Sequence, residues 1–357
     1  MKAAFYAPMK HPDHPVASGD RTMARGVLAA LNAAGIAATT VSSLQSREGK
    51  GDPARQAALI TQAKAEAARI VAQSANASWD VWITYHSYYK APDLLGPIVT
   101  QALGIPYILI EATRARKRLT GPWAAFAHAA ENAADAADAV LYMTTRDAEA
   151  LHAYAPKSQI IKRLNPFLAQ DRLPPVTHYD GAILSVGMLR SGDKLASYHL
   201  IAETLAQLGH QDWRLNIAGD GPARAQVERL MAPFGTQVQF LGALDDATMQ
   251  QAYQRSSILL WPGANEAFGM TYLEAQAAGL AIVAQDRPGV RDVLSPTSVY
   301  PTPDAGTKAL AQILDTLLTD TCKTKSLGQS GRSHIANHHL LKSAAKTLTD
   351  TLCEVRA

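Results

Sequence analysis

The chain has 357 residues, which is enough for two domains of ordinary size that each bury their own core. Hydrophobic residues make up 47% of it and charged residues 18%, a balance that excludes an intrinsically disordered chain. A net charge of +3 is too small to indicate a nucleic-acid partner.

The first half of the sequence alternates between short apolar runs and helical patterns. Helices are predicted over 20–34, which stops at Gly35, and over 53–74, which has Pro53 in its first turn. Parallel strands need such crossovers, so the alternation predicts a parallel sheet covered by helices. The apolar runs predict strands at 3–6, 37–41, 81–85, 106–110, 139–143 and 160–164.

The second half repeats this alternation after a polar, proline-bearing segment, 169–178, which we expect to be the linker. The sequence therefore predicts an α/β protein with two doubly wound domains, over 1–168 and 179–335. A last helical segment, 336–357, either packs back on the first domain or ends the second. The predicted strands of this half are 182–186, 214–217, 238–241, 258–260 and 281–283.

Residues 1–7 lack the apolar core of a signal peptide, and no apolar run approaches the ~18 residues needed to cross a bilayer. Cys322 and Cys353 lie in helical patterns without metal-ligand spacing, which fits a reducing compartment. We expect a cytoplasmic protein, with peripheral contact at the inner face of the membrane as an open alternative.

The most informative segment is 261–275, which leaves an apolar strand, passes through a Gly/Asn loop and enters a helix predicted over 270–278. Glu266 in the loop and Glu274 in the helix flank the helix N-terminus, where free N–H groups favour an anion such as a diphosphate. The N–H groups in question surround Phe268, Gly269 and Met270. Carboxylates are poor phosphate ligands, so we expect Glu266 and Glu274 to accept hydrogen bonds from sugar hydroxyls. The alternative is a pair of surface charges that complement the helix dipole.

This Glu-x7-Glu pattern, with Phe-Gly between the carboxylates and the strand 280–284 after the helix, resembles the donor-site signature of retaining glycosyltransferases of family 4. The next loop departs from the family, because Pro288 replaces a Gly and Asp292 a Glu. The resemblance covers most of the C-terminal half and, more thinly, the N-terminal half. It implies a GT-B fold, in which two Rossmann-like domains face each other across a cleft, and a hexosyltransferase-type enzyme (EC 2.4).

Three further segments of the second half resemble the family's donor site. Gly187 opens the loop after strand 182–186, and Arg190 and Lys194 in that loop are placed to bind the diphosphate, although Met188 stands at the family's usual Arg position. Leu241 belongs to the segment whose backbone meets the base. A loop that resembles the family's Gly-Asp-Gly-Pro contains Gly219, Asp220 and Gly221. Ordinary turn and strand chemistry is the alternative for the last two segments.

The first half offers candidates at three strand ends. Gly19 is the single glycine of a turn that is usually glycine-rich in the family, and Asp20 either caps the helix or faces a substrate. His86 closes strand 81–85 and is a candidate to hydrogen-bond the acceptor or the transferred sugar; the alternative is a structural histidine. Glu111 stands where many relatives carry a Thr-x-His, and we expect it to face the acceptor.

A compact basic run, 114–118, follows Glu111. It indicates either capture of an anionic acceptor or membrane surface, or a solvated helix start, and the sequence favours the helix start.

No Asp-x-Asp stands at a strand end, so nothing in the sequence indicates a metal ion that bridges the diphosphate. We expect Lys194, Arg190 and the helix N–H groups to neutralise the leaving group, Glu266 to hold the transferred sugar and Glu274 the ribose. No cofactor is expected, because the nucleotide sugar, UDP- or GDP-linked, is itself a substrate. The acceptor is a saccharide, a lipid-linked saccharide or a small molecule, and the usual setting of relatives is polysaccharide or glycolipid assembly.

Two other functions remain open at this stage. Met188, the single Gly19 and the missing Thr-x-His are compatible with an inactive subunit that only binds a nucleotide sugar. A nicotinamide-dependent oxidoreductase is poorly supported, because no Gly-x-Gly-x-x-Gly opens the first helix.

Overall fold

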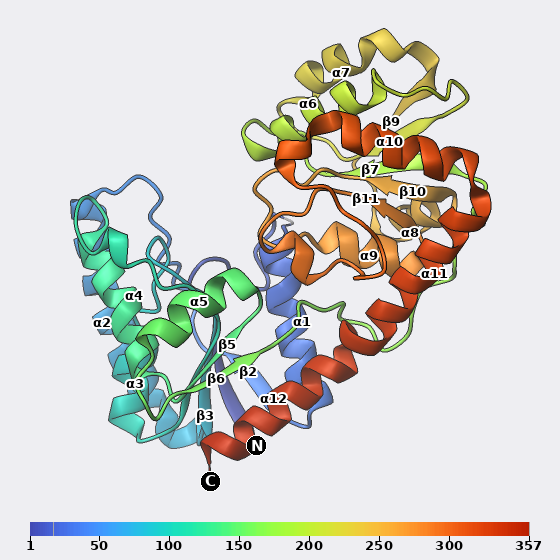
Figure 1. Cartoon of the computed structure of the whole chain (residues 1–357). Helices are drawn as coiled ribbons and strands as arrows, with labels where there is room; N and C mark the ends of the chain where they lie inside the picture. Colours follow the sequence, from blue (N-terminus) through green and yellow to red (C-terminus); the bar gives the residue numbers. More distant parts are fainter. Residues whose placement is uncertain (17, 357) are drawn as a thin grey trace. The chain divides into compact units, whose positions relative to one another are not determined.

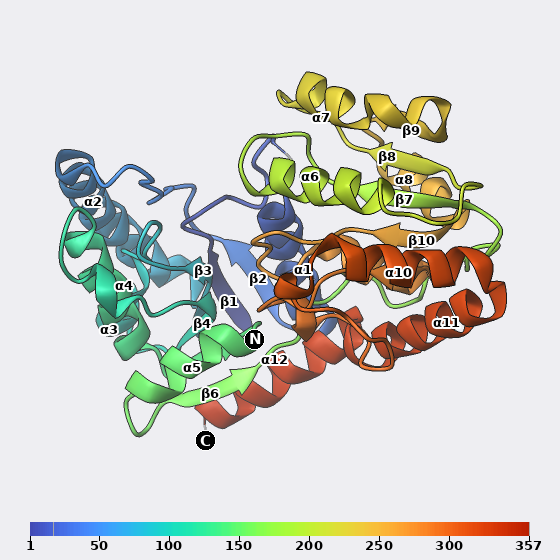
Figure 2. The ribbon, with the colours of Figure 1, turned by 45° about the horizontal axis from the view of Figure 1, so that its top comes forward.

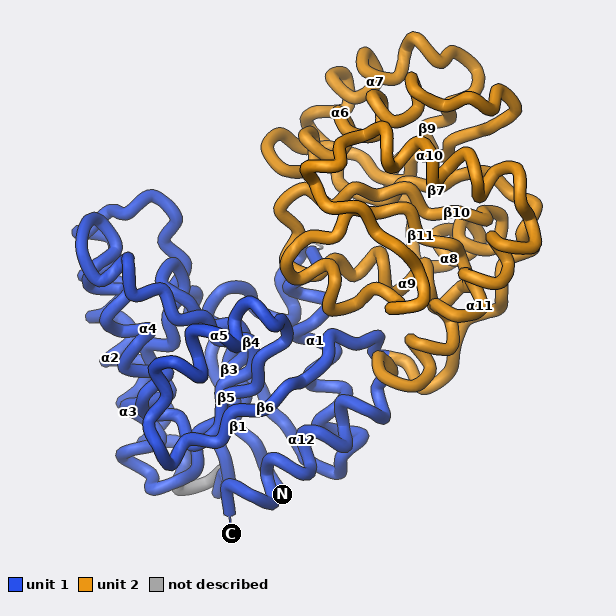
Figure 3. The backbone as a smooth tube through the Cα atoms, in the orientation of Figure 1, with its two compact units in different colours: residues 1–169, 341–357 blue, residues 170–340 orange. Residues whose placement is uncertain are grey.

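The computed structural model describes residues 1–16 and 18–356, and for residues 75–77 the backbone alone. The chain divides into unit 1, residues 1–169 and 341–357, and unit 2, residues 170–340 (Figure 3). Each unit contains one parallel sheet flanked by helices, which confirms the predicted α/β fold with two Rossmann-like domains. The cleft predicted between them stays a prediction. Ala17 of the loop before the first helix and Ala357 lie outside the described residues.

Unit 1 is built on six parallel strands in the order β2-β1-β3-β4-β5-β6. The interior strands are nearly continuous apolar runs, as expected for a sheet that is covered on both faces. The direction of strand succession reverses between β1 and β3, so the loops after these two strands diverge from one point on the sheet edge. The strands are β1 (Lys2–Tyr6), β2 (Ala37–Thr40), β3 (Val81–Ser87), β4 (Tyr107–Ala112), β5 (Ala139–Tyr142) and β6 (Ile160–Arg163).

The helices of unit 1 cover both faces of this sheet (Figures 1 and 2). The helices α1 and α12 lie side by side, and α2, α3 and α4 form a second group. Ser18 is the N-cap of α1, because its side chain accepts the N–H of Arg21. Asp20 lies in the first turn, so the alternative that it caps the helix is wrong, and its role toward a substrate stays a prediction. The helices are α1 (Gly19–Ala33), α2 (Pro53–Ala77), α3 (Gly96–Leu103), α4 (Ala124–Ala136), α5 (Thr145–Tyr154) and α12 (Leu341–Val355), with a short 3₁₀ turn η1 (Arg116–Arg118).

Unit 2 is built on five parallel strands in the order β11-β10-β7-β8-β9, and succession reverses between β7 and β10. Ligands of open parallel sheets bind outside the carboxyl ends of the strands at such a switch point. The strands are β7 (Ala182–Val186), β8 (Leu215–Ala218), β9 (Val238–Gly242), β10 (Ser256–Leu260) and β11 (Ala281–Val283).

In unit 2, α6 packs beside α7 and α10, whereas α9 packs beside α8 and α11. Within the described residues, none of the helices is long and apolar enough to span a membrane. The helices are α6 (Asp193–Leu205), α7 (Arg224–Met231), α8 (Asp246–Gln254), α9 (Met270–Ala278), α10 (Gly306–Thr319) and α11 (Thr321–His338), with the 3₁₀ turns η2 (Ala232–Gln237), η3 (Val290–Asp292) and η4 (Pro303–Ala305).

The amphipathic helix α12 offers a test of its contribution to unit 1. Leu348 lies on its buried face and is 1% exposed. We expect Leu348→Ala to lower the free energy of unfolding of unit 1 by about 2–5 kcal/mol, because a buried side chain is lost and a cavity is left. The exposed Lys346 on the same helix is the control, and Lys346→Ala is expected to change stability by no more than about 0.5 kcal/mol. Urea unfolding measures both, and equal effects would contradict burial of α12.

Candidate functional site

Two predicted residues of unit 2 form an ion pair where the strand order reverses. Lys194 lies in the first turn of α6, which follows β7, and Glu266 lies in the loop after β10. The Lys194 ammonium pairs with Oε1 of Glu266, and Nε1 of Trp261 donates to the same oxygen at 3.1 Å. The lysine nitrogen also lies 5.2 Å from the centroid of the Trp261 ring. The two charged side chains are only 19% and 15% exposed, so the pair is partly withdrawn from water.

Trp261 is the residue that holds this pair in place. Its ring meets that of Tyr198 from α6 edge to face at 5.4 Å, and its carbonyl accepts the hydroxyl of Tyr272 from α9 at 2.9 Å. A Cβ on Gly187 would lie 2.6 Å from the same ring, so only glycine leaves room for it. Trp261 is not among the site residues that the sequence predicts. The available signal was a large aromatic residue at the carboxyl end of a buried strand.

The loop that carries Glu266 is tied to the first two turns of α6. The N–H of Ala264 donates to Oγ of Ser197 at 3.0 Å, and the Asn265 amide donates to Asp193 at 3.1 Å. Asn265 itself has a left-handed backbone with φ of +50°. These bonds fix the direction in which Glu266 leaves the loop.

The helix α9 begins immediately after this loop. Gly269 is its N-cap, with φ of +80°, and among the described residues no side chain caps it. The first N–H groups of α9, beside the buried Phe268 and the half-buried Met270, are therefore available to an anion. Glu274 lies one turn further on and accepts the hydroxyl of Tyr253 at 2.8 Å. Burial raises the pKa of Glu274, and this hydrogen bond partly opposes the rise.

The loops after β7, β8 and β9 pack backbone to backbone. The N–H of Gly187 donates to the carbonyl of Ala218 at 3.0 Å, and that of Gly219 to the carbonyl of Gly242 at 2.8 Å. Gly219 has φ of +141°, and a Cβ there would lie 2.0 Å from the Gly187 oxygen, so no other residue fits. Gly221 lies in the same way against Leu189. Gly187, Gly219 and Gly221 thus lie together.

Other predicted donor-site residues take no part in this arrangement. Arg190 is exposed, and its side chain has no hydrogen bond or ion pair with the described residues. The Asp220 carboxylate accepts the N–H of Gly221 at 2.8 Å and lies 3.5 Å from the Arg224 guanidinium. Leu241 is half-buried within β9.

In unit 1 a second charged pair lies where the strand order reverses. Asp20, in the first turn of α1 just after Gly19, accepts a hydrogen bond from Nδ1 of His86 at 2.5 Å. His86 lies near the end of β3, and Glu111 lies near the end of the neighbouring β4. His86 has φ of +61° and Glu111 has φ of +57°, although neither is glycine. Such backbones cost about 1–3 kcal/mol each and cluster at functional sites.

The surroundings of His86 make it a cation at neutral pH. Burial by itself would lower the pKa of His86, but the carboxylates of Glu111, Asp20 and Asp147 outweigh burial and raise it to about 9. Burial raises the pKa of Glu111, and His86 and the Tyr85 hydroxyl oppose the rise. Within the described residues, Oδ2 of Asp20 and Oε2 of Glu111 are buried without a hydrogen-bond partner. Buried acceptors are normally satisfied, so this cluster is suited to a ligand that donates hydroxyl groups.

The basic run 114–118 is not the solvated helix start that the sequence favours. Arg114 is buried and pairs with Glu131 at 2.7 Å and with Asp135 at 2.6 Å, both on α4. Residues 116–118 form the short turn η1, and α4 begins only at Ala124. The buried ion pairs fold the start of the run against α4, which the sequence pattern did not reveal.

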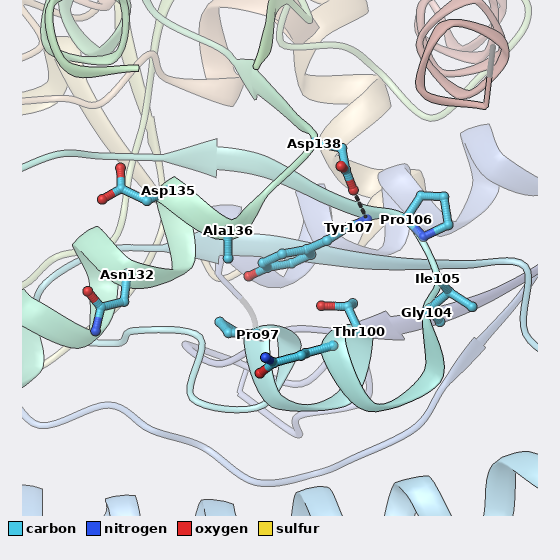
Figure 4. A pocket seen from close by; sticks show the side chains of 11 residues that line it. Pro97, Thr100, Gly104, Ile105, Pro106, Tyr107, Asn132, Asp135, Ala136 and Asp138 are labelled. Carbon is cyan, nitrogen blue, oxygen red and sulfur yellow. Dashed lines mark hydrogen bonds between the residues drawn. The ribbon is translucent and has the colours of Figure 1, made fainter. Parts of the chain in front are cut away.

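Two open depressions lie away from these charged pairs. One, of about 850 Å³, is lined by α3, α4 and the start of β4, where the N–H of Tyr107 donates to Asp138 at 2.8 Å (Figure 4). The other, of about 560 Å³, lies at the amino ends of β7 and β8, beside Gly181 and Arg214. Both are at the amino ends of strands, whereas the candidate residues follow the carboxyl ends. Neither depression belongs to the candidate site.

Residues 180–334 match the family model of glycosyl transferases group 1. The match lies within unit 2, contains Lys194, Glu266 and Glu274, and makes up less than half of the chain.

Several curated relatives of the chain are glycosyltransferases. The GDP-mannose-dependent monoacylated alpha-(1-6)-phosphatidylinositol monomannoside mannosyltransferase of Corynebacterium glutamicum is 26% identical over 148 residues, which are 40% of this chain and 39% of that enzyme. A GDP-mannose-dependent alpha-mannosyltransferase of Mycolicibacterium smegmatis is 36% identical over 95 residues, 26% of this chain and 24% of that enzyme. These alignments span well under two thirds of either relative. Alpha-D-kanosaminyltransferase of Streptomyces kanamyceticus is 24% identical over 297 residues, 76% of this chain and 74% of that enzyme.

Solved structures extend the likeness to the whole chain. Sucrose-phosphate synthase from Thermosynechococcus elongatus has a TM-score of 0.73 at 17% identity and covers 99% of both chains. Anabaena HepE in complex with UDP has a TM-score of 0.74 at 14% identity, covering 99% of this chain and 100% of that one. At these identities the likeness shows the fold, which is the GT-B glycosyltransferase fold. The family match and the relatives support a glycosyltransferase, while family 4 membership and retention stay predictions.

The charge of His86 is directly measurable. We expect its imidazole to titrate with a midpoint of about 9 instead of 6.5. Because the folded-state pKa is raised, its stabilising contribution is complete below about pH 6.5 and is lost as the pH rises through about 9. NMR titration, with His86→Gln to assign the resonance, gives the midpoint. Asp20→Asn removes one neighbouring carboxylate and should move the midpoint down; an ordinary midpoint in the unsubstituted protein would contradict the charged cluster.

Proposed function

We propose that the chain is a glycosyltransferase that moves a sugar from a nucleoside diphosphate to an acceptor hydroxyl, with retention at the anomeric carbon and without a metal ion. The observation that carries this proposal is the Lys194–Glu266 pair beside the uncapped start of α9, inside the segment that matches group 1 glycosyl transferases. This places a cation and free N–H groups, which suit the diphosphate of a nucleotide sugar, beside a carboxylate, which suits the hydroxyls of its sugar.

Each part of the donor has a matching group in unit 2. The α9 N–H groups and the Lys194 ammonium are suited to the diphosphate. Trp261 and Lys194 both bind Oε1 of Glu266, which leaves Oε2 to accept hydroxyls of the transferred sugar. Glu274 is suited to the ribose. UDP and GDP are both candidates, because HepE was solved with UDP and the corynebacterial relative uses GDP-mannose.

In the proposed reaction the bond between the anomeric carbon and the diphosphate oxygen breaks, a bond to the acceptor oxygen forms, and the proton of the acceptor hydroxyl passes to the departing diphosphate. Negative charge develops on the departing diphosphate, and fixed donors at such a position are worth about 3–4 kcal/mol each. Lys194 and the α9 N–H groups supply this stabilisation in place of a metal ion. We assign no protein nucleophile.

The acceptor in this proposal binds to the strand ends of unit 1. The protonated His86 donates a hydrogen bond, and the unpartnered oxygens of Asp20 and Glu111 accept from acceptor hydroxyls. The relatives named above include a mannosyltransferase that acts on a phosphatidylinositol mannoside, which supports a saccharide or lipid-linked acceptor. We place the reaction in glycolipid or polysaccharide assembly, in the cytoplasm or at the inner face of a membrane.

The ion pair provides the main test. Lys194→Met and Glu266→Gln keep the shape of each side chain but remove its charge, and each is expected to slow transfer by about 10²–10³-fold. Transfer is measured with radiolabelled UDP- and GDP-sugars and a panel of saccharide and lipid-linked acceptors. Lys308→Met, at an exposed lysine on α10, is the matched control and should leave the rate unchanged.

Thermal unfolding of the same proteins separates chemistry from folding. Leaving one partly buried charge unpaired is expected to cost about 1–3 kcal/mol, which unit 2 should survive. Normal turnover in a folded Lys194→Met or Glu266→Gln protein would overturn the mechanism.

Glu274 predicts a pH dependence of nucleotide binding. Its raised pKa means that the carboxylate, which accepts the ribose hydroxyls, is lost as the pH falls toward that pKa. We therefore expect the Kd for UDP or GDP to rise in mild acid. Tyr253→Phe removes the hydrogen bond that favours the carboxylate, so the rise should begin at a higher pH. Calorimetric titration measures both curves, and coincident curves would refute the ribose assignment.

An inactive nucleotide-sugar-binding subunit is the alternative, and the exposure of both Met188 and Arg190 favours it. Slow hydrolysis of the donor without acceptor decides between the two functions. A transferase shows such hydrolysis, whereas a subunit that only binds the donor does not.

A further inference from the structure

Five residues of unit 1, which we call the aromatic–cation cluster, lie beyond His86. They are Tyr88, Tyr89, Lys90, Arg118 and Trp123. The Lys90 nitrogen lies 5.6 Å from the centroid of the Tyr89 ring and 5.1 Å from that of Trp123. The Arg118 guanidinium lies 5.3 Å and 5.4 Å from the same two rings. Two cations therefore share two aromatic rings.

The positive charges of this cluster are not neutralised by carboxylates. Among the described residues, neither Lys90 nor Arg118 has a carboxylate oxygen within 4.0 Å, in contrast to the neighbouring Arg114. A third cation, Arg47, faces the hydroxyl of Tyr88: burial raises the pKa of Tyr88 and Arg47 opposes the rise. Like charges gathered without counter-charges attract an anion.

Two donors in the cluster lack acceptors. Within the described residues, Nε of Arg118 and Nε1 of Trp123 are buried without a hydrogen-bond partner. Cation–π attraction accounts for the stacking of Lys90 and Arg118, but it gives these N–H groups no acceptor. Buried donors of this kind are normally satisfied, so the missing partner is an acceptor that the described residues do not supply.

The cluster is continuous with the proposed acceptor site. The ring of Tyr88 lies 5.1 Å from that of His86, Tyr89 lies 5.6 Å from Tyr88, and Trp123 lies 5.7 Å from Tyr89. Lys90 follows β3 and Arg118 follows β4, so both emerge from the carboxyl edge of the sheet that carries His86 and Glu111. A ligand that donates hydroxyls to Asp20 and Glu111 can therefore extend over these rings.

We propose that the acceptor is an anionic saccharide, in which a phosphate or carboxylate binds Lys90 and Arg118 while a sugar ring stacks on Tyr89 or Trp123. This inference rests on the proposed function, because it names the class of acceptor for the same site. Aromatic faces suit the apolar faces of sugar rings, and a guanidinium binds phosphate or carboxylate through two parallel hydrogen bonds. The anion is carried either by a free saccharide or by a lipid headgroup.

The test uses the full chain and probes of known composition. Binding of glucose 6-phosphate and of glucose is measured by calorimetry, and binding to vesicles of phosphatidylcholine with or without phosphatidylglycerol by sedimentation. Lys90→Gln/Arg118→Gln removes both charges of the cluster. Lys117→Gln is the matched control, since Lys117 is an exposed cation of the same turn η1.

We expect glucose 6-phosphate to bind at least about tenfold more tightly than glucose, and the double variant to lose that preference. Lys117→Gln should keep the preference for glucose 6-phosphate. Lys194→Met should keep it as well, and this result would exclude binding at the diphosphate site of unit 2. Loss of phosphatidylglycerol-dependent sedimentation in the double variant identifies a lipid-borne anion; a loss confined to glucose 6-phosphate identifies a free one. The proposal is overturned if the protein prefers neither glucose 6-phosphate to glucose nor vesicles with phosphatidylglycerol to vesicles without it. It is also overturned if such a preference survives in the double variant.

Failure of this inference is distinguishable from failure of the proposed function. The double variant should bind UDP or GDP as the unsubstituted protein does, because its changes lie in unit 1. Nucleotide binding without anion preference overturns the acceptor class alone. Anion preference without nucleotide binding or transfer overturns the glycosyltransferase and leaves the cluster as an anion site.

Discussion

The ion pair between Lys194 and Glu266 joins the first turn of α6 to the loop after β10, two segments 72 residues apart in the chain. A partly buried carboxylate without a partner is costly, so Lys194 and Trp261 together determine where Glu266 lies. Much of unit 2 supports this arrangement: Gly187 leaves space for the indole, Tyr198 and Tyr272 hold it, and Ser197 anchors the loop. The uncapped start of α9 follows directly from the same loop.

Unit 1 uses the same topological device with different chemistry. His86 and Asp20 are 66 residues apart, yet they meet because β1 and β3 are neighbours where the strand order reverses. In unit 2 the cation is a lysine, Lys194, paired with a single carboxylate. In unit 1 it is a histidine that is charged because carboxylates surround it. Removing one carboxylate of that cluster therefore lowers the pKa of His86. For this reason we treat Asp20, His86 and Glu111 as one group.

Three of the non-glycine residues with a positive φ lie at or beside the charged pairs. His86, Glu111 and Asn265 adopt left-handed backbones without being glycine, and all three lie at the carboxyl ends of strands or in the loop that follows one. The surrounding sheet must supply the energy that these conformations cost, because a free loop would relax. The aromatic–cation cluster extends the charged edge of unit 1. The sequence pattern indicated Arg118 only as part of the basic run 114–118, and it did not bring Arg118 together with Lys90, Tyr89 and Trp123, because these residues meet only through the fold.

The sequence by itself determined the order of strands and helices. Short apolar runs indicate strands and a repeat of about 3.6 residues indicates helices, and both patterns can be seen in residues that are close together in the chain. It also indicated Glu266 and Glu274, because a strand, loop and helix in succession fix where a helix N-terminus lies, and Lys194, because its loop follows a strand end. Their assignment to a donor site came from the resemblance to family 4 glycosyltransferases. Only the tertiary structure decided which side chains meet. Trp261 on Glu266, Tyr253 on Glu274, Asp20 on His86, and Arg114 on α4 all join segments that are adjacent through strand pairing or helix packing. Such contacts depend on strand order and packing, which local periodicity does not encode. For the same reason the sequence could not tell that the Arg190 side chain is exposed and that Asp220 lies beside Arg224.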